Sequence, residues 1–149
     1  MKVAPAFELE RLGGGRLALS ELLLNSPVLL VFFKISCPIC QLTLPYLERL
    51  KDGKLRIILA SQDDAESTAE FHAAFGTSLE TLLDSEDACY PVSNAYGITN
   101  VPTLFLIEQD GTVSERIDGF VKREMLSLGA RCGIAPFRQD ERVPEWKAG

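Results

Sequence analysis

The feature that most constrains this chain is an apolar run joined to a pair of cysteines. The run is Pro27-Val28-Leu29-Leu30-Val31-Phe32-Phe33, and Cys37-Pro38-Ile39-Cys40 follows after three residues. A short apolar run rich in β-branched and aromatic residues predicts a buried strand. Residues 41–51 then carry leucines at helical spacing, which predicts a helix. The two cysteines therefore lie where a central strand passes into a helix.

A strand-to-helix junction suits thiol chemistry. The first N–H groups of a helix have no intrahelical partners, so the start of a helix is electropositive and stabilises a thiolate. Two intervening residues allow the sulfurs of Cys37 and Cys40 to meet within the first helical turn. The spacing therefore fits one thiol that attacks a disulfide and a second thiol that resolves the product.

The rest of the chain predicts an α/β fold. A second apolar strand at 55–60 is expected to run parallel to the first across a right-handed helical crossover. Helices on both faces of a mixed sheet make three layers. We expect residues 1–137 to form one domain and residues 138–149, with Pro144 and Trp146, to form a polar extended tail. The other expected elements are a Ser20-capped helix at 21–24, a helix ending at Gly76, a short helix at 91–96, a strand at 103–107, a turn at 110–111, an antiparallel strand at 112–117 and a helix at about 122–131.

Charge and hydropathy narrow the function classes. The net charge is -6, from 15 Lys and Arg against 21 Asp and Glu, and there is no basic stripe with interleaved aromatics, so no nucleic-acid partner is expected. No apolar segment is long enough to predict a membrane span. The first residues lack the apolar core of a signal peptide, which predicts a cytoplasmic protein, or a periplasmic one if a leader precedes this sequence.

A single Cys-x-x-Cys pair allows zinc, structural and redox interpretations. A zinc site needs further ligands at suitable spacing, but Cys89 and Cys132 are isolated and His72 is the sole histidine. A structural disulfide across so short a loop would constrain the unfolded chain little. Next to a βαβ pattern the pair favours redox chemistry. Acidic residues precede Cys89 and disfavour a thiolate there, and Cys132 is expected to be a small buried apolar residue.

Two motifs carry a family resemblance. Residues 32–40, with Pro45 in the following helix, resemble the active-site segment of the thioredoxin superfamily, most closely its TlpA/ResA-like thiol-disulfide oxidoreductases. Residues 4–9 resemble the opening motif of that group, and residues 95–107 resemble its second signature. The likeness extends from about Ala4 to Arg131. It implies a thioredoxin-like three-layer α/β/α sandwich with a mixed central sheet.

The resemblance also implies roles for individual residues. Cys37 would be the attacking thiolate and Cys40 the buried resolving thiol. Pro102 would be a cis proline that faces the pair, and the alternative is an ordinary proline at the start of a strand. The backbone of Val101 would pair with an extended substrate, and Thr103 completes that motif. Pro38 and Ile39, between the cysteines, would face the substrate.

Several positions depart from the family pattern. Ser36 replaces the tryptophan that often precedes the first cysteine, and Lys34 replaces a small residue. We expect the Lys34 side chain to point to water. The alternative is that its ammonium group reaches the site and stabilises the thiolate of Cys37. Val31 stands where thioredoxins carry a buried acid. Asp63, after the next strand, aligns with the acid that would take a proton from Cys40, although Asp63 or Asp64 could equally cap the next helix.

We therefore predict an enzyme that exchanges thiols and disulfides without a metal, flavin or nicotinamide cofactor. Its expected partners are a disulfide-containing protein or a small thiol as substrate, and a redox protein that donates or accepts electrons. One alternative is a peroxiredoxin-like thiol peroxidase, although the hydroxyl residue and proline expected upstream of its cysteine are missing. A redox-regulated module or a copper carrier is another, but the wider spacing and added histidine of copper carriers are absent.

Overall fold

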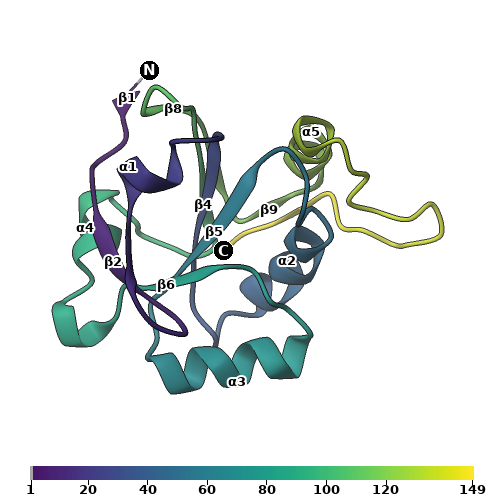
Figure 1. Ribbon diagram of the computed structural model, residues 1–149. Coiled ribbons are helices and arrows are strands. Elements are labelled where there is room, and N and C mark those ends of the chain that lie inside the picture. The colour runs from purple at the N-terminus through teal and green to yellow at the C-terminus, as the bar shows by residue number, and fades with distance from the viewer. Residues whose placement is uncertain (1) are drawn as a thin grey trace.

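The computed structural model describes residues 2–149, which are built on a mixed sheet with the strand order β1-β8-β7-β4-β5-β6-β2-β3 (Figure 1). The central strands β4, β5 and β6 are parallel, and β7 runs antiparallel to β4. The expected mixed sheet is therefore present, extended at both edges by short strands. The strands are β1 (Lys2–Val3), β2 (Glu8–Arg11), β3 (Arg16–Ala18), β4 (Val28–Phe33), β5 (Arg56–Ser61), β6 (Thr81–Leu83), β7 (Thr103–Ile107) and β8 (Thr112–Asp118).

Helices cover both faces of this sheet, which confirms the three-layer prediction. Side chains of α2, α3 and α5 pack on one face, and those of α1 and α4 pack on the other. The crossover from β4 through α2 to β5 forms the predicted βαβ unit. The helices are α1 (Leu19–Leu22), α2 (Pro38–Glu48), α3 (Ala65–Phe75), α4 (Pro91–Ala95) and α5 (Lys122–Cys132), with a 3₁₀ turn η1 (Glu86–Ala88).

Strand β4 is buried along its whole length. Because successive side chains of a strand point to opposite faces, Leu29, Val31 and Phe33 pack with the α2 layer. Val28, Leu30 and Phe32 pack with the α1 and α4 layer. Burial on both faces explains why the sequence is continuously apolar here rather than alternating. The strand thereby fixes the position of the cysteines that follow it.

Local capping decides where the helices begin. Asp64 caps α3, because its carboxylate accepts a hydrogen bond from the Ser67 amide at 2.7 Å. The predicted cap at Ser20 is wrong, since α1 begins at Leu19, two residues before the expected start, and Ala18 occupies the cap position. There the Glu21 carboxylate accepts the Ala18 amide at 3.1 Å, so the side chain at the third helical position satisfies the amide of the cap residue.

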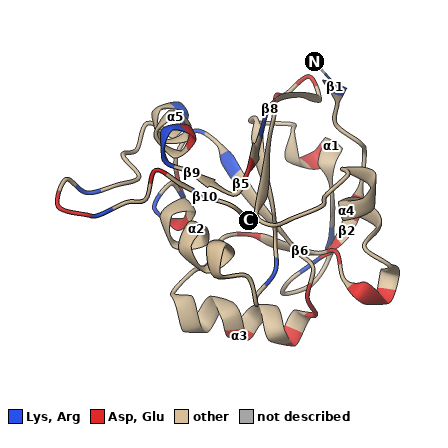
Figure 2. Cartoon of the chain, turned by 180° about the vertical axis from the view of Figure 1, so that it is seen from behind, with Lys and Arg blue, Asp and Glu red and all other residues tan. Residues whose placement is uncertain are grey.

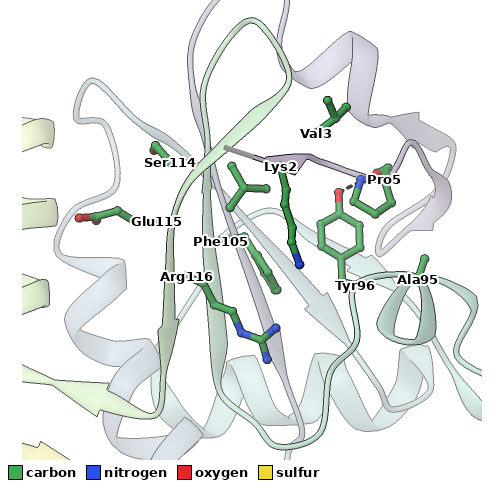
Figure 3. A pocket seen from close by; sticks show the side chains of 10 residues that line it. Lys2, Val3, Pro5, Ala95, Tyr96, Phe105, Ser114, Glu115 and Arg116 are labelled. Carbon is green, nitrogen blue, oxygen red and sulfur yellow. Dashed lines mark hydrogen bonds between the residues drawn. The ribbon is translucent and has the colours of Figure 1, made fainter.

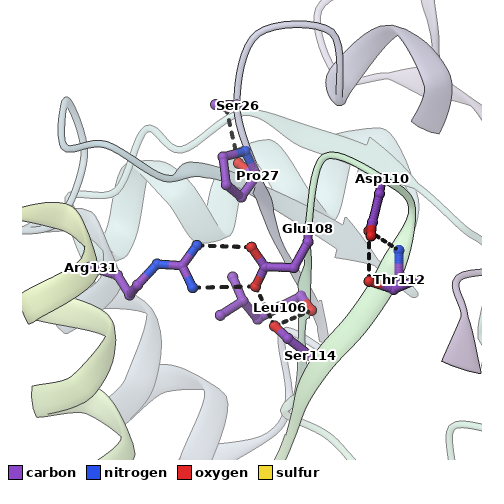
Figure 4. A network of polar contacts seen from close by, with 8 residues as sticks. All are labelled: Ser26, Pro27, Leu106, Glu108, Asp110, Thr112, Ser114 and Arg131. Atoms are coloured by element: carbon purple, nitrogen blue, oxygen red, sulfur yellow. Dashed lines mark hydrogen bonds and ion pairs between the residues drawn. The ribbon is translucent and has the colours of Figure 1, made fainter. Parts of the chain in front are cut away.

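The β7–β8 hairpin is fixed at both ends. At its turn, the Asp110 carboxylate accepts the amide of Thr112 at 2.9 Å. At the start of that turn, Glu108 accepts two hydrogen bonds from Arg131 of α5, at 3.0 and 3.3 Å (Figure 4). At the other end, the Gly119 amide donates to the Pro102 carbonyl at 2.8 Å. The hairpin therefore carries residues 119–121 to the loop before β7.

The last residues return to the domain. Strand β10 (Trp146–Lys147) pairs antiparallel with β9 (Phe120–Val121), and the yellow segment of Figure 1 runs back beside β9. Lysine and arginine, like aspartate and glutamate, are scattered along the chain in the view of Figure 2, with no continuous basic band there. Within residues 2–149 no helix has both the length and the apolar character needed to cross a bilayer.

Candidate active site

Cys37 and Cys40 open helix α2. Cys37 is the N-cap, Pro38 takes the first helical position, and the Cys40 amide donates to the Cys37 sulfur at 3.2 Å. Proline suits this position because it lacks the N–H that a first turn leaves unpaired. Cys37 is half-buried, whereas Cys40 is fully buried. One sulfur therefore meets solvent at a helix N-terminus, and the other lies beneath it.

Burial controls the protonation of Cys40. Desolvation raises the pKa of its thiol well above the ordinary value, and the nearby charges of Cys37 and Asp63 act in the same direction. A hydrogen bond involving the Lys34 backbone opposes the shift. At neutral pH this thiol therefore keeps its proton until a nearby group removes it.

The loop between β4 and α2 is held by one side chain from α2 and one from the loop that follows β5. The Ile35 amide donates to Asp63 Oδ2 at 2.8 Å, and the Gln41 amide nitrogen donates to the Ile35 carbonyl at 2.9 Å. Asp64, not Asp63, caps α3, so the two adjacent acids have separate tasks. The carboxylate of Asp63 is thereby aimed at the cysteine loop. The sequence predicts Gln41 only as a helical residue, without this contact to the loop.

A second loop, before β7, brings Val101 and Pro102 to the cysteines. The Val101–Pro102 bond is cis, as the resemblance implied. The Cys37 thiol donates to the Val101 carbonyl at 3.4 Å. Thr103 is fully buried, and its hydroxyl donates to the Asn100 carbonyl at 2.8 Å, so this side chain supports the loop from inside.

Helix α4 is tied to the end of the sheet by a buried carboxylate. Asp84, just after β6, accepts the amides of Val92 at 3.0 Å and Ser93 at 2.6 Å. Gln62 donates to the Ser93 hydroxyl at 2.9 Å, and its own amide donates to the Phe33 carbonyl at 3.1 Å. This network connects the helix before the Val101 loop with the strand before the cysteines. Nothing in the sequence pattern around Asp84 singled it out.

The rim of the site is polar. Lys34, Ser36 and Pro38 are exposed and Ile39 is half-buried. The exposed position of Lys34 agrees with the expectation that it points to water. Beside Lys34 and Ser36 a hollow of about 250 Å³ opens toward Asp63. Val31 is fully buried, so the position of the thioredoxin acid holds an apolar side chain.

The remaining candidates lie apart from this centre. Cys89 is exposed in the loop after η1, and Cys132 is buried in the core as predicted. His72 is held by the Thr77 and Thr81 hydroxyls at 2.7 and 2.9 Å, so its ring nitrogens are engaged in the fold. Across residues 2–149 no group of three His, Cys, Asp or Glu side chains converges as a metal site would require.

A larger cavity lies on the other face of the sheet. It has a volume of about 440 Å³ and lies between β1, α4 and β8. Figure 3 shows Tyr96, Phe105, Lys2 and Arg116 among the side chains that line it. The Arg116 guanidinium lies 5.3 Å from the centre of the Phe105 ring. Phe105 packs in the layer opposite that of Cys40, so this cavity is separate from the thiols.

Comparison with known proteins places this geometry in a family. The sequence pattern of the AhpC/TSA family matches residues 1–116. The chain belongs to the AhpC/TSA family. Thiol-disulfide oxidoreductase ResA of Geobacillus kaustophilus is 30% identical over 126 residues, which span 81% of this chain and 70% of that protein. ResA of Bacillus anthracis is 29% identical over 130 residues, spanning 84% and 73%.

Solved structures agree with this AhpC/TSA assignment at the level of the fold. A thiol:disulfide interchange protein from Bacteroides sp. superposes with a TM-score of 0.76 at 21% identity, over 89% of each chain. The predicted thioredoxin-like fold is therefore confirmed. The protein is a ResA-like thiol-disulfide oxidoreductase, with Cys37 and Cys40 as its Cys-x-x-Cys pair.

Proposed function

We propose that Cys37 attacks the substrate disulfide and that Cys40 resolves the product. The observation that carries this assignment is the difference between the two thiols. Cys37 caps α2, is partly open to solvent and contacts the Val101 carbonyl, while Cys40 is fully buried. A substrate sulfur can reach only the first of them without rearrangement of the fold.

The exchange then proceeds in two balanced steps. The Cys37 thiolate attacks one substrate sulfur, the substrate S–S bond breaks, and the released sulfur leaves as a thiolate while a mixed disulfide forms. Cys40 gives up its proton and attacks the Cys37 sulfur, so the Cys37–Cys40 disulfide forms and the second substrate thiolate departs. Two electrons have passed to the substrate, and the reverse sequence oxidises a dithiol.

Asp63 is the proposed acceptor of the Cys40 proton. Its carboxylate is fixed by the Ile35 amide at 2.8 Å, and its charge contributes to the raised pKa of Cys40. A buried thiol with a raised pKa needs such a base in order to react at neutral pH. Because Asp64 caps α3, Asp63 is available for this role.

The Val101 loop is the proposed substrate-binding edge. Pro102 lacks an N–H, whereas the main chain of Val101 lies beside the reactive thiol and suits pairing with an extended polypeptide. The exposed Pro38 and the half-buried Ile39 lie between the two cysteines, and Thr103 holds the loop in place. We assign the thioredoxin-like domain that carries this site to residues 1–137. Its proposed partners are a protein disulfide or a small thiol, and a redox protein that renews the pair.

A redox titration tests this assignment. The protein is equilibrated with glutathione or dithiothreitol couples, alkylated and weighed by mass spectrometry. A reversible Cys37–Cys40 disulfide is expected, and failure to form it would contradict the proposal. A potential near about -270 mV favours a reductant and one near about -120 mV favours an oxidant. The first result would suit the proposed cytoplasmic location and the second a periplasmic one.

A further inference from the structure

The C-terminal segment, residues 138–149, lies along the domain as a strap. After α5 the chain swings outward and returns beside β9 (Figure 1). Trp146 is paired with Val121, and Lys147 is paired with Phe120. The Lys122 amide also donates to the Glu145 carbonyl at 2.9 Å. The strap is thus held by main-chain hydrogen bonds.

An ion pair ties the strap to the helix that carries the cysteines. Arg49, at the end of α2, donates to both carboxylate oxygens of Glu141, at 2.6 and 2.8 Å. The same guanidinium donates to the Pro136 carbonyl at 2.9 Å and lies 4.9 Å from the centre of the Tyr46 ring. Phe137, just before the strap, packs edge-on against Tyr46. The strap is therefore anchored at about its fourth residue.

The end of the strap reaches the proposed substrate edge. A methyl group placed on Gly149 would lie 2.4 Å from the Val101 carbonyl oxygen and 3.2 Å from the Asn100 amide nitrogen. A methyl group on Gly119 would lie 2.4 Å from the Lys147 carbonyl oxygen. Main chain therefore meets main chain at both places. The Cys37 thiol is 3.4 Å from the same Val101 oxygen, so thiol and strap converge on one carbonyl.

We propose that the strap occupies the edge at Val101 and selects which disulfides reach Cys37. This inference rests on the proposed function of that edge. An extended polypeptide that pairs with Val101 must displace residues 147–149, whereas a small disulfide needs only the exposed part of the Cys37 sulfur. Residues 145–149 are exposed, and Trp146 retains 62% of its accessible surface. A segment with so little buried surface can open without unfolding the domain.

The first test compares a protein disulfide with a small one. Reduced protein is mixed with insulin or with cystine, and the single-turnover rates of Cys37 and Cys40 oxidation are measured. Removing residues 138–149, or Glu141→Ala, should speed the insulin reaction about tenfold, because a closed site lowers apparent affinity by the open fraction. The cystine rate should change less than about twofold. An unchanged ratio of the two rates would overturn the proposal.

The matched control is Glu108→Ala. Glu108 also accepts two hydrogen bonds from an arginine, Arg131, but that pair links α5 to the β7–β8 hairpin (Figure 4). Losing it should leave the ratio of insulin to cystine rates at the wild-type value. A ratio that rises equally in Glu108→Ala and Glu141→Ala would mean that general loosening, and not the strap, controls access.

The second test needs no change in the strap. Cys40→Ser protein is joined through Cys37 to a cysteine-containing peptide, and hydrogen exchange is compared with that of the unmodified variant. The Lys122 amide should lose protection in the adduct, because its bond to Glu145 opens. Retained protection of the Lys122 amide in the adduct would overturn the proposal. This result does not depend on whether the variant without residues 138–149 folds. Absence of any Cys37 adduct, together with a failed redox titration, would instead count against the proposed function.

Discussion

The Cys37 sulfur lies 3.4 Å from the carbonyl oxygen of Val101, although 64 residues separate them in the chain. This contact joins the two halves of the active site. One half is the junction of β4 and α2, and the other is the loop that leads into β7. The chemistry of the cysteine pair and the binding of a polypeptide are consequently set by neighbouring atoms.

The two cysteines should give opposite results when each is replaced. Cys40→Ser should accumulate a stable mixed disulfide with a substrate, because the exposed Cys37 can still attack but nothing resolves the product. Cys37→Ser should form no such adduct, since Cys40 is fully buried, provided that both variants also carry Cys89→Ser to remove the other exposed thiol. Mass spectrometry of the intact proteins after incubation with oxidised substrate measures both. Equal adduct yields in the two variants would reverse or abolish the assigned roles.

Asp63→Asn distinguishes a proton acceptor from a bystander charge. If Asp63 accepts the Cys40 proton, its loss should slow the resolving step at least about tenfold at neutral pH. If it acts only through its charge, the same change should lower the pKa of Cys40 and speed that step, because the charge raises this pKa. Rapid-quench measurement of the decay rate of the mixed disulfide distinguishes these two roles of Asp63. Asp64→Asn, which alters the cap of α3, should leave that decay unchanged.

Alkaline pH should weaken the reduced protein through Cys40. Burial raises the pKa of this thiol in the folded state, so above about pH 8.5 the unfolded chain releases a proton that the folded protein keeps. The free energy of unfolding then falls by up to about 1.4 kcal/mol per pH unit for this group. Urea unfolding of the reduced wild-type protein and of Cys40→Ser between pH 8 and 10 measures this pH dependence of the free energy of unfolding. Parallel curves would contradict the prediction, because serine does not ionise in this range.

The sequence predicts those parts of the fold that carry a periodic or compositional signal. The apolar run before Cys37 becomes the fully buried β4, and Asp110-Gly111 becomes the turn of the β7–β8 hairpin. These signals are local, since they follow from side-chain alternation and from the turn preferences of aspartate and glycine. The position of the Cys37–Cys40 pair is also predicted by local signals, because it follows from the strand and the helix on either side.

The remaining features depend on contacts between distant residues. Strand β10 consists of Trp146–Lys147 alone, which is too short for any alternation, and it exists because β9 lies beside it. Asp63 and Asp64 are chemically identical neighbours. Only the direction in which the chain leaves β5 turns one toward the Ile35 amide and the other toward Ser67. The expected polar extended tail is therefore paired with the surface of the domain through β10, which its composition did not reveal.

Asp84→Ala should be the most destabilising single change among the polar residues around the site. Its buried carboxylate accepts the Val92 and Ser93 amides and the Ser93 hydroxyl, which the variant would leave unpaired in the interior. We expect a loss of about 3 kcal/mol in the free energy of unfolding, measured with urea. The control is Asp110→Ala, which also removes bonds to an amide and a hydroxyl but at an exposed turn. A similar loss in both variants would show that burial does not set the cost.

Acid should release the strap through Glu141. Hydrogen bonds from the Arg49 side chain, and then from the Arg138 amide, lower the pKa of Glu141 to about 2. In an open strap this carboxyl should titrate near about 4.3. Because the closed state has the lower pKa, the contact is complete above about pH 4.3 and is lost as the pH falls toward 2. The Lys122 amide resonance should therefore shift over this range and stay constant between pH 5 and 7. Glu141→Gln should abolish the shift, and a transition that persists in that variant would assign it to another carboxyl.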